Sequence, residues 1–113
     1  MRGSSRTIVE PRVSAPIFAA LGDETRLRLV SRLCHDGPMS IARLTAGTHV
    51  TRQAITKHLR VMQEAGLVHS TRHGRESVWQ LQARRLEEAL RYVEQISKQW
   101  DAALARLRKL VQD

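Results

Sequence analysis

The sequence predicts a mainly α-helical domain that carries a small β-hairpin, an α+β fold. Three observations favour this fold. Hydrophobic residues make up 42% of the 113 residues and aromatic residues only 4%, so a single core of aliphatic side chains is expected. Several stretches place apolar residues at helical spacing between capping residues and glycines. One stretch near residue 74 has the strand–turn–strand pattern of a hairpin.

The composition also argues against several classes of protein. No run approaches the ~18 consecutive apolar residues of a membrane span, and the start lacks the apolar segment of a signal peptide. Cys34 is the single cysteine, so no disulfide forms within the chain and we expect a cytoplasmic protein. Glycine-rich phosphate loops, metalloprotease motifs and a Ser-His-Asp set are not found, and we do not expect an enzyme.

The positive charge is concentrated in one segment. The formal net charge is +8, and residues 38–78 carry six Lys or Arg against two Glu, which gives +4. Half of the excess charge therefore lies in 41 of the 113 residues. A basic face is typical of proteins that bind a polyanion, which on charge alone is DNA, RNA or an anionic membrane.

The beginning of the chain predicts an arm followed by a short helix. Residues 1–14 are polar, mixed in charge and interrupted by Pro11, and we interpret them as a mobile arm. The next segment, "APIFAALG" at residues 15–22, is apolar and predicts a short helix that ends near Gly22. This helix would open a domain that spans residues 15–82.

The second predicted helix has a wide apolar face. Asp23 is a natural N-cap for "ETRLRLVSRLC", and Gly37 followed by a proline suits its end. Cys34 falls on the apolar face, and we expect it to be a buried structural cysteine. The face comprises Leu27, Val30 and Cys34, flanked by Leu29 and Leu33.

Two further helices are joined by a turn. Ser40 is a suitable cap for a third short helix at residues 41–47, and residues 48–50 form a turn. Thr51 caps the next helix, which Gly66 ends. Such a pair is a helix-turn-helix. The core-facing residues of its second helix are Ala54, Ile55, Leu59 and Met62.

Residues 67–81 change from helical to strand periodicity. Strand-type residues flank His73-Gly74, where glycine suits a hairpin turn, and Arg72 and Arg75 bracket the tip. The hairpin is a two-stranded wing appended to the helix-turn-helix, so the predicted architecture is a winged helix-turn-helix.

Nothing breaks a helix in the last part of the chain. Residues 83–113 predict a dimerisation helix of about 45 Å at 1.5 Å per residue, too long for a core this small to cover. Eight positions of this helix, seven of them apolar, form a stripe along one side. They are spaced alternately four and three residues apart, which is the pattern of a helix packed along another helix. We expect homodimerisation through the first and the last helix, with Ser97 as the polar exception. The stripe comprises Leu86, Leu90, Val93, Ser97, Trp100, Leu104, Leu107 and Val111.

The second helix of the helix-turn-helix has an unusual polar face. Its members are hydrogen-bond donors, several are basic and none is acidic, which suits the base edges and phosphates of a DNA major groove. Arg72 and Arg75 on the wing are expected to reach the backbone or the minor groove. His58 lies between both faces and is interpreted as a boundary residue, with phosphate contact as the alternative. The face comprises Thr51, Arg52, Gln53, Thr56, Lys57 and Arg60.

These motifs together resemble the ArsR/SmtB family of bacterial winged-helix repressors. "FAALGDETRLRLVSRL" is similar to the opening signature of the family, "VTRQAITKHLRVMQEAGLV" to its recognition segment and "RHGRESVWQL" to its wing. The resemblance covers roughly residues 16–82, and the last helix fits by position. It implies a homodimer that binds an operator with two-fold symmetry and represses transcription.

The metal sites of the family transfer poorly. Its third-helix site needs a Cys-x-Cys pair, and the aligned residues are Ser40 and Ala42. Its last-helix site needs histidines, and none follows His73. The chain therefore resembles the metal-independent branch, and we expect no metal, no cofactor, no membrane partner and no obligate small-molecule ligand.

Other functions remain open at this point. An effector-responsive repressor, released from DNA by a metal, a thiol reaction or a small molecule, would keep the same DNA-binding face. A protein-interaction module would use the winged helix as a docking surface, but it gives no reason for donors without carboxylates on residues 51–60. An RNA major groove is too deep and narrow for this helix.

Overall fold

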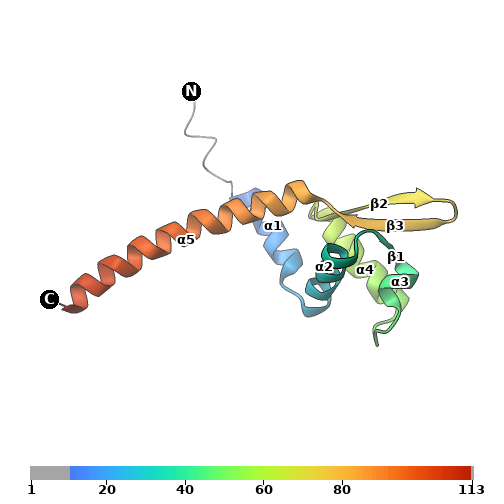
Figure 1. The fold of residues 1–113 in the computed structure, drawn as a ribbon, viewed down its shortest axis with the longest axis horizontal. Helices are drawn as coiled ribbons and strands as arrows, with labels where there is room; N and C mark the ends of the chain where they lie inside the picture. Colours follow the sequence, from blue (N-terminus) through green and yellow to red (C-terminus); the bar gives the residue numbers. More distant parts are fainter. Residues whose placement is uncertain (1–10, 113) are drawn as a thin grey trace, which may run out of the picture.

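A computed structural model describes residues 11–112. The first helices cluster at one end of the molecule, a hairpin projects from that end, and the last helix runs far out on the other side (Figure 1). The predicted α+β class with a winged helix-turn-helix is confirmed. The elements in chain order are α1 (Pro11–Leu21), α2 (Glu24–Asp36), β1 (Met39–Ser40), α3 (Ile41–Thr45), α4 (Arg52–Glu64), β2 (Val68–His73), β3 (Glu76–Leu81) and α5 (Ala83–Gln112).

Helices α2, α3 and α4 begin at the predicted caps. The side chains of Asp23, Ser40 and Thr51 each accept the backbone N–H three residues later, at 3.0, 3.3 and 3.1 Å. These bonds satisfy donors that a helix start otherwise leaves without a partner. Helices α2 and α4 end before Gly37 and Gly66, whose φ angles of 81° and 82° lie in the left-handed region.

The core lies where α1, α2, α3 and α4 meet the small sheet. Helix α4 contributes Ile55, Leu59 and Met62, which are at most 1% exposed and lie on one face of the helix. Burying each side chain of this size contributes about 1.5–3 kcal/mol. The rest of the core comprises Ile17, Ala20, Leu29, Leu33, Met39, Leu44, Leu67, Val68, Trp79 and Ala89.

The sheet has three antiparallel strands in the order β1-β3-β2. His73 pairs with Glu76, so the turn is Gly74-Arg75, and the turn predicted at His73-Gly74 is wrong by one residue. Gly74, the first residue of the turn, has a φ of 66°, whereas Arg75, the second, does not have a positive φ. This combination is that of a type II′ turn. The strand β1 was not predicted, because two residues show no periodicity.

The first helix begins earlier than the sequence predicted. Residues 11–14 belong to α1 rather than to an arm, whereas the arm expected over residues 1–10 lies outside the described residues. Pro11 occupies the first helical position, where a proline costs no hydrogen bond. Ser14 is 1% exposed, so the buried face of α1 starts inside the segment that its polar composition assigned to an arm.

The predicted face of α2 is rotated in the structure. Leu29 and Leu33, four residues apart, are 3% and 4% exposed, and they define the buried face. Leu27 is 51% exposed and Cys34 is exposed, so the expectation of a buried cysteine is wrong. Val30 packs against the core beside them, so the buried face is centred on Leu29 and Leu33, and Leu27 and Cys34 lie outside it.

Helix α5 matches its predicted range and divides into two parts. Ala89 is buried and Leu86 is half-buried against the core of the same chain, and Tyr92 meets Phe18 of α1 with ring centroids 6.0 Å apart. Beyond this region α5 extends away from the domain (Figure 1), which accounts for the 65 Å length of the molecule. Among residues 11–112, no helix has the length and apolarity needed to cross a membrane.

We predict that the Asp23 cap gives the fold a specific acid sensitivity. The backbone N–H of Arg26 bound to the carboxylate holds the pKa of Asp23 below its usual 3.8. A lowered pKa in the folded state stabilises the protein above pH 3.8 and ceases to do so as the pH falls through the folded value. In urea unfolding between about pH 7 and pH 3, Asp23→Asn should therefore flatten the loss of stability, since asparagine caps without titrating.

Asp101→Asn, which removes an exposed carboxylate from the middle of α5, is the control and should keep the wild-type profile. An unchanged profile in Asp23→Asn would contradict the role assigned to this cap.

Candidate nucleic-acid interface

Because the apolar side of α4 is buried in the core, its polar side faces solvent. Thr51, Arg52, Gln53, Lys57 and Arg60 are exposed, and Thr56 is half-buried at the edge of the same face. Between residues 37 and 75 the sequence has one acid, Glu64, and it lies at the far end of α4. The leading face of the helix is therefore cationic and rich in donors.

The two threonine hydroxyls on this face are already engaged within the helix. Thr51 Oγ1 accepts the backbone N–H of Ala54 at 3.1 Å, and Thr56 Oγ1 donates to the carbonyl oxygen of Arg52 at 2.9 Å. Thr51 keeps its own proton to donate, whereas Thr56 has its proton committed. Thr56 therefore offers a ligand its methyl group and its small size rather than a donor.

A three-helix junction holds the orientation of α4. Arg26 of α2 donates from Nε to the carbonyl oxygen of Ala20 in α1, and its Nη1 lies 3.2 Å from Nδ1 of His58 in α4. Arginine has only donors, so this contact is a hydrogen bond in the tautomer of His58 whose Nδ1 accepts. Asp23 Oδ2 lies 3.8 Å from the same Nδ1. His58 is half-buried at the edge of the polar face, as the boundary interpretation expects, but its hydrogen bond reaches α2 rather than crossing the helix-turn-helix.

The wing presents both predicted arginines to solvent. Arg72 pairs with Ser77 across the hairpin and is exposed, and Arg75 lies in the turn itself. Trp79 on the opposite strand is 6% exposed and anchors β3 in the core. Since β3 also pairs with β1, the wing is attached to the start of α3 through Met39↔Trp79 and Ser40↔Val78.

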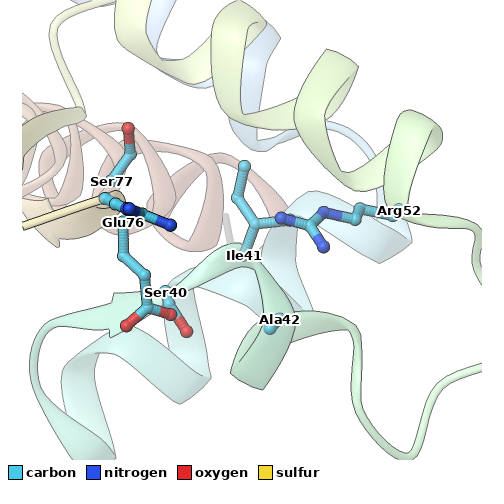
Figure 2. Close-up of a pocket in the computed structure, with 7 residues that line it drawn as sticks. Ser40, Ile41, Ala42, Arg52, Glu76 and Ser77 are labelled. Carbon is cyan, nitrogen blue, oxygen red and sulfur yellow. The ribbon is translucent and has the colours of Figure 1, made fainter.

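A cavity of about 160 Å³ lies between α3, the start of α4 and the wing (Figure 2). In Figure 2 the side chain of Arg52 extends across the cavity toward Ile41, and that of Glu76 reaches toward Ser40. Sequence reasoning missed Ser40, Glu76 and Ser77 as neighbours of the basic residues, because only the β1–β3 pairing brings them there. The lining comprises Ser40, Ile41, Ala42, Arg52, Arg75, Glu76 and Ser77.

No metal site is found in the part of the chain that the structure describes. Its His, Cys, Asp and Glu side chains do not come together in groups of three or more. Ser40 and Ala42, at the positions where the metal-binding relatives need cysteines, line the cavity between α3 and the wing instead.

The fold and this surface define a class of protein. A helix-turn-helix presents its second helix to a major groove, and the exposed donor face of α4 meets that requirement. The β2–β3 hairpin, whose Arg72 and Arg75 are exposed, projects from the same end of the molecule (Figure 1). The chain is a winged helix-turn-helix DNA-binding transcriptional regulator.

Comparisons with known proteins agree with this class. A family model described as a helix-turn-helix domain matches residues 21–71. The HTH-type transcriptional regulator YuzN of Bacillus subtilis (strain 168) is 42% identical over 65 residues, which cover 52% of this chain and 71% of that protein. An ArsR-like transcriptional regulator from Rhodococcus sp. RHA1 has a TM-score of 0.74 and 36% identity, over 88% of this chain and 92% of that one.

A more distant structure shares the fold alone. The homodimeric winged helix-turn-helix DNA-binding domain (fragment 1–100) of Mb0332 from Mycobacterium bovis has a TM-score of 0.60 and 19% identity, over 84% of both chains. The 36% identity to the Rhodococcus protein, over 92% of that chain, is high enough to assign the family as well as the fold. The chain belongs to the ArsR family of transcriptional regulators.

We predict that Glu76 weakens DNA binding. Its carboxylate lines a cavity together with Arg52 and Arg75, so it opposes the approach of a phosphate to both cations. Glu76→Gln should tighten binding to any duplex by about fivefold in low salt, which corresponds to about 1 kcal/mol for a close charge pair near water. Fluorescence anisotropy with a labelled duplex measures this change.

Glu64→Gln removes the same charge from the far end of α4 and serves as the matched control. Equal tightening in both variants would show that only net charge matters and would remove Glu76 from the interface.

Proposed function

We propose that this protein is a homodimeric repressor that binds a two-fold symmetric operator through the major groove. The observation that carries the proposal is the outward face of α4, where exposed donors and cations occupy successive turns without a carboxylate. A solvated helix surface normally mixes both signs of charge. The membership of the family supports the repressor role, which the resemblance implies.

The residues on α4 divide into two tasks. Gln53 and Lys57 are proposed to contact base edges, since Gln pairs with adenine and Lys with guanine. Arg52 is proposed to contact either a guanine edge or a phosphate. Thr51 and Arg60 are proposed to hold phosphates, which positions the helix without selecting a sequence. The small side chain of Thr56, whose proton is already committed to the helix, allows close approach and suits a thymine methyl group.

The wing adds contacts outside the major groove. Arg72 and Arg75 are proposed to contact the backbone or the adjacent minor groove. Their exposure and the attachment of β3 to the core support this role, because a fixed hairpin holds its arginines at a constant distance from α4.

The seam proposed for the dimer lies along α5. Leu90, Val93, Trp100, Leu104 and Leu107 are 57%, 46%, 63%, 40% and 56% exposed in the single chain. An apolar stripe on a projecting helix of this kind is expected to be covered by a partner. Leu86, also proposed for the seam, lies at the end of the stripe nearest the domain, where it packs partly against the core of its own chain. The homodimeric Mycobacterium bovis domain with the same fold supports a second copy as that partner.

The proposal includes a metal-independent mode of action in the cytoplasm. Ser40 and Ala42 lack the thiolates that a third-helix metal site requires, which supports this branch of the family. The two half-sites of the operator would lie about one helical turn, ~34 Å, apart.

The test of the proposal is a selection from random duplex DNA at about physiological salt. A two-fold symmetric motif is the expected result, since each subunit reads one half-site with the same residues. Enrichment of no motif, with salt-sensitive bulk binding only, would overturn sequence-specific recognition.

Two variants should separate base reading from phosphate contact on the selected duplex. Gln53→Ala is expected to cost ~1–3 kcal/mol and to relax the preference at one base position. Arg75→Ala is expected to weaken binding to all sequences and to lower the salt slope by about 1 for each subunit. An unchanged sequence preference in Gln53→Ala would contradict its assignment.

A charge in the α5 seam should separate the subunits. Leu104→Glu places a carboxylate among apolar side chains and is expected to raise the dimer dissociation constant by about 100-fold or more. Sedimentation should show a monomer, while the far-ultraviolet circular dichroism stays helical. Ala105→Glu adds the same charge one residue away on an exposed site and should remain dimeric. A dimeric Leu104→Glu would contradict the seam.

A further inference from the structure

A second cavity, of about 280 Å³, lies on another side of the helix-turn-helix. It is bounded by α2 on one side and by the turn between α3 and α4 on the other. The cavity shares no lining residue with the cavity beside the wing. Its lining comprises Thr25, Arg28, Leu29, Arg32, Leu44, Gly47, Thr48, His49, Val50 and Ile55.

The cavity combines an apolar floor with a cationic rim. Leu29, Leu44 and Ile55 are at most 3% exposed, so the floor consists of core side chains. The rim holds the guanidinium groups of Arg28 and Arg32, together with hydroxyl and imidazole groups, and no acid lines it. An apolar cavity of about 150 Å³ holds a benzene molecule. This volume therefore accepts two fused rings or one ring with a short side chain.

The two arginines are arranged to receive an anion. Arg32 Nη1 donates to the carbonyl oxygen of Leu44 at 3.0 Å and Nη2 donates to Met39 Sδ at 3.7 Å, so both terminal nitrogens hold the guanidinium in place. Each of these nitrogens carries a second N–H that can donate to a ligand. Arg28 pairs with Glu24 one turn earlier in α2, and both side chains are about three-quarters exposed. An exposed pair of this kind contributes little, so a carboxylate ligand competes with it readily.

We propose that this cavity binds a small aromatic carboxylate, with the ring on the apolar floor and the carboxylate at Arg28 and Arg32. This site is separate from the proposed operator-binding face. It adds a small-molecule ligand to a protein for which the sequence predicted no obligate one. Both requirements of a small-molecule site are met, a largely apolar concave surface and a few fixed polar groups.

Occupancy is coupled to DNA through the turn. Thr48 Oγ1 donates to the carbonyl oxygen of Thr45 at 2.8 Å and lies 3.3 Å from the backbone N–H of Val50, so the turn is held by its own bonds. Thr51 follows directly as the cap of α4. A ligand seated against Thr48 and Val50 biases the direction in which α4 starts. This step, unlike the site itself, rests on the proposed use of α4 for DNA.

The site is tested without DNA, by titrating the isotope-labelled full chain with naphthalene-2-carboxylate and recording amide chemical shifts. Shifts should concentrate in residues 25–32 and 47–50. Arg28→Met should weaken binding about fivefold, as expected for one lost charge contact near water, and neutral naphthalene-2-carboxamide should also bind less tightly. Arg91→Met, which removes an exposed arginine from α5, is the matched control and should bind as wild type.

Three results would overturn the site: no saturable shifts, shifts confined to the apolar stripe of α5, or equal affinity for the acid and the amide. These results do not depend on DNA, so they are distinct from a failure of operator binding.

A second arm adds naphthalene-2-carboxylate to the complex with the selected duplex. Weaker duplex binding is expected for both proteins, but Arg28→Met should need about fivefold more ligand than wild type for the same effect. If Arg28→Met alone weakens duplex binding and lowers the salt slope, the rim is a phosphate contact and the proposal fails.

Discussion

The burial of one face of α4 is the constraint on which the rest of the surface depends. Ile55, Leu59 and Met62 enter the core from successive turns, and each contributes about 1.5–3 kcal/mol. A rotation of the helix by one residue would expose them and press Thr56, Arg60 and Gln63 toward the same core. That change costs the apolar burial and adds the desolvation of a charge. The polar face is therefore aimed outward by the core.

The junction at Arg26 makes this constraint cooperative across three helices. Its guanidinium joins the end of α1 to His58 of α4, while its backbone N–H satisfies the cap at Asp23. The same residue thus fixes the start of α2 and the rotation of α4. The outer part of α5, beyond the contact of Tyr92 with Phe18, carries a row of exposed apolar side chains. The first half of the molecule buries its apolar side chains internally, whereas the exposed apolar row of α5 is the seam proposed for the dimer.

The sequence predicted the elements that local chemistry controls. The caps at Asp23, Ser40 and Thr51 and the range of α5 followed from residue types and spacing. Cys34 was misplaced because the apolar residues of α2 cover more of its circumference than the core accepts. Glu76 was missed as a neighbour of Arg52 for another reason: the two residues line one cavity only because β3 pairs with β1 ahead of α3. Local sequence patterns therefore predict where helices begin and end, whereas contacts between distant segments can be read only from the folded structure.

The position of the turn between α3 and α4 limits how this protein can be regulated. Because α4 is fixed along its length by core side chains, the segment ahead of Thr51 is where a small ligand biases it at low cost. A ligand shifts an equilibrium only by the difference of its affinities for the two states. A tenfold difference is worth about 1.4 kcal/mol at one cavity. In a symmetric dimer two cavities act on one operator, so the same difference lowers operator affinity by up to about a hundredfold. Modest selectivity at a small cavity is then sufficient for release, without a metal or a reactive thiol.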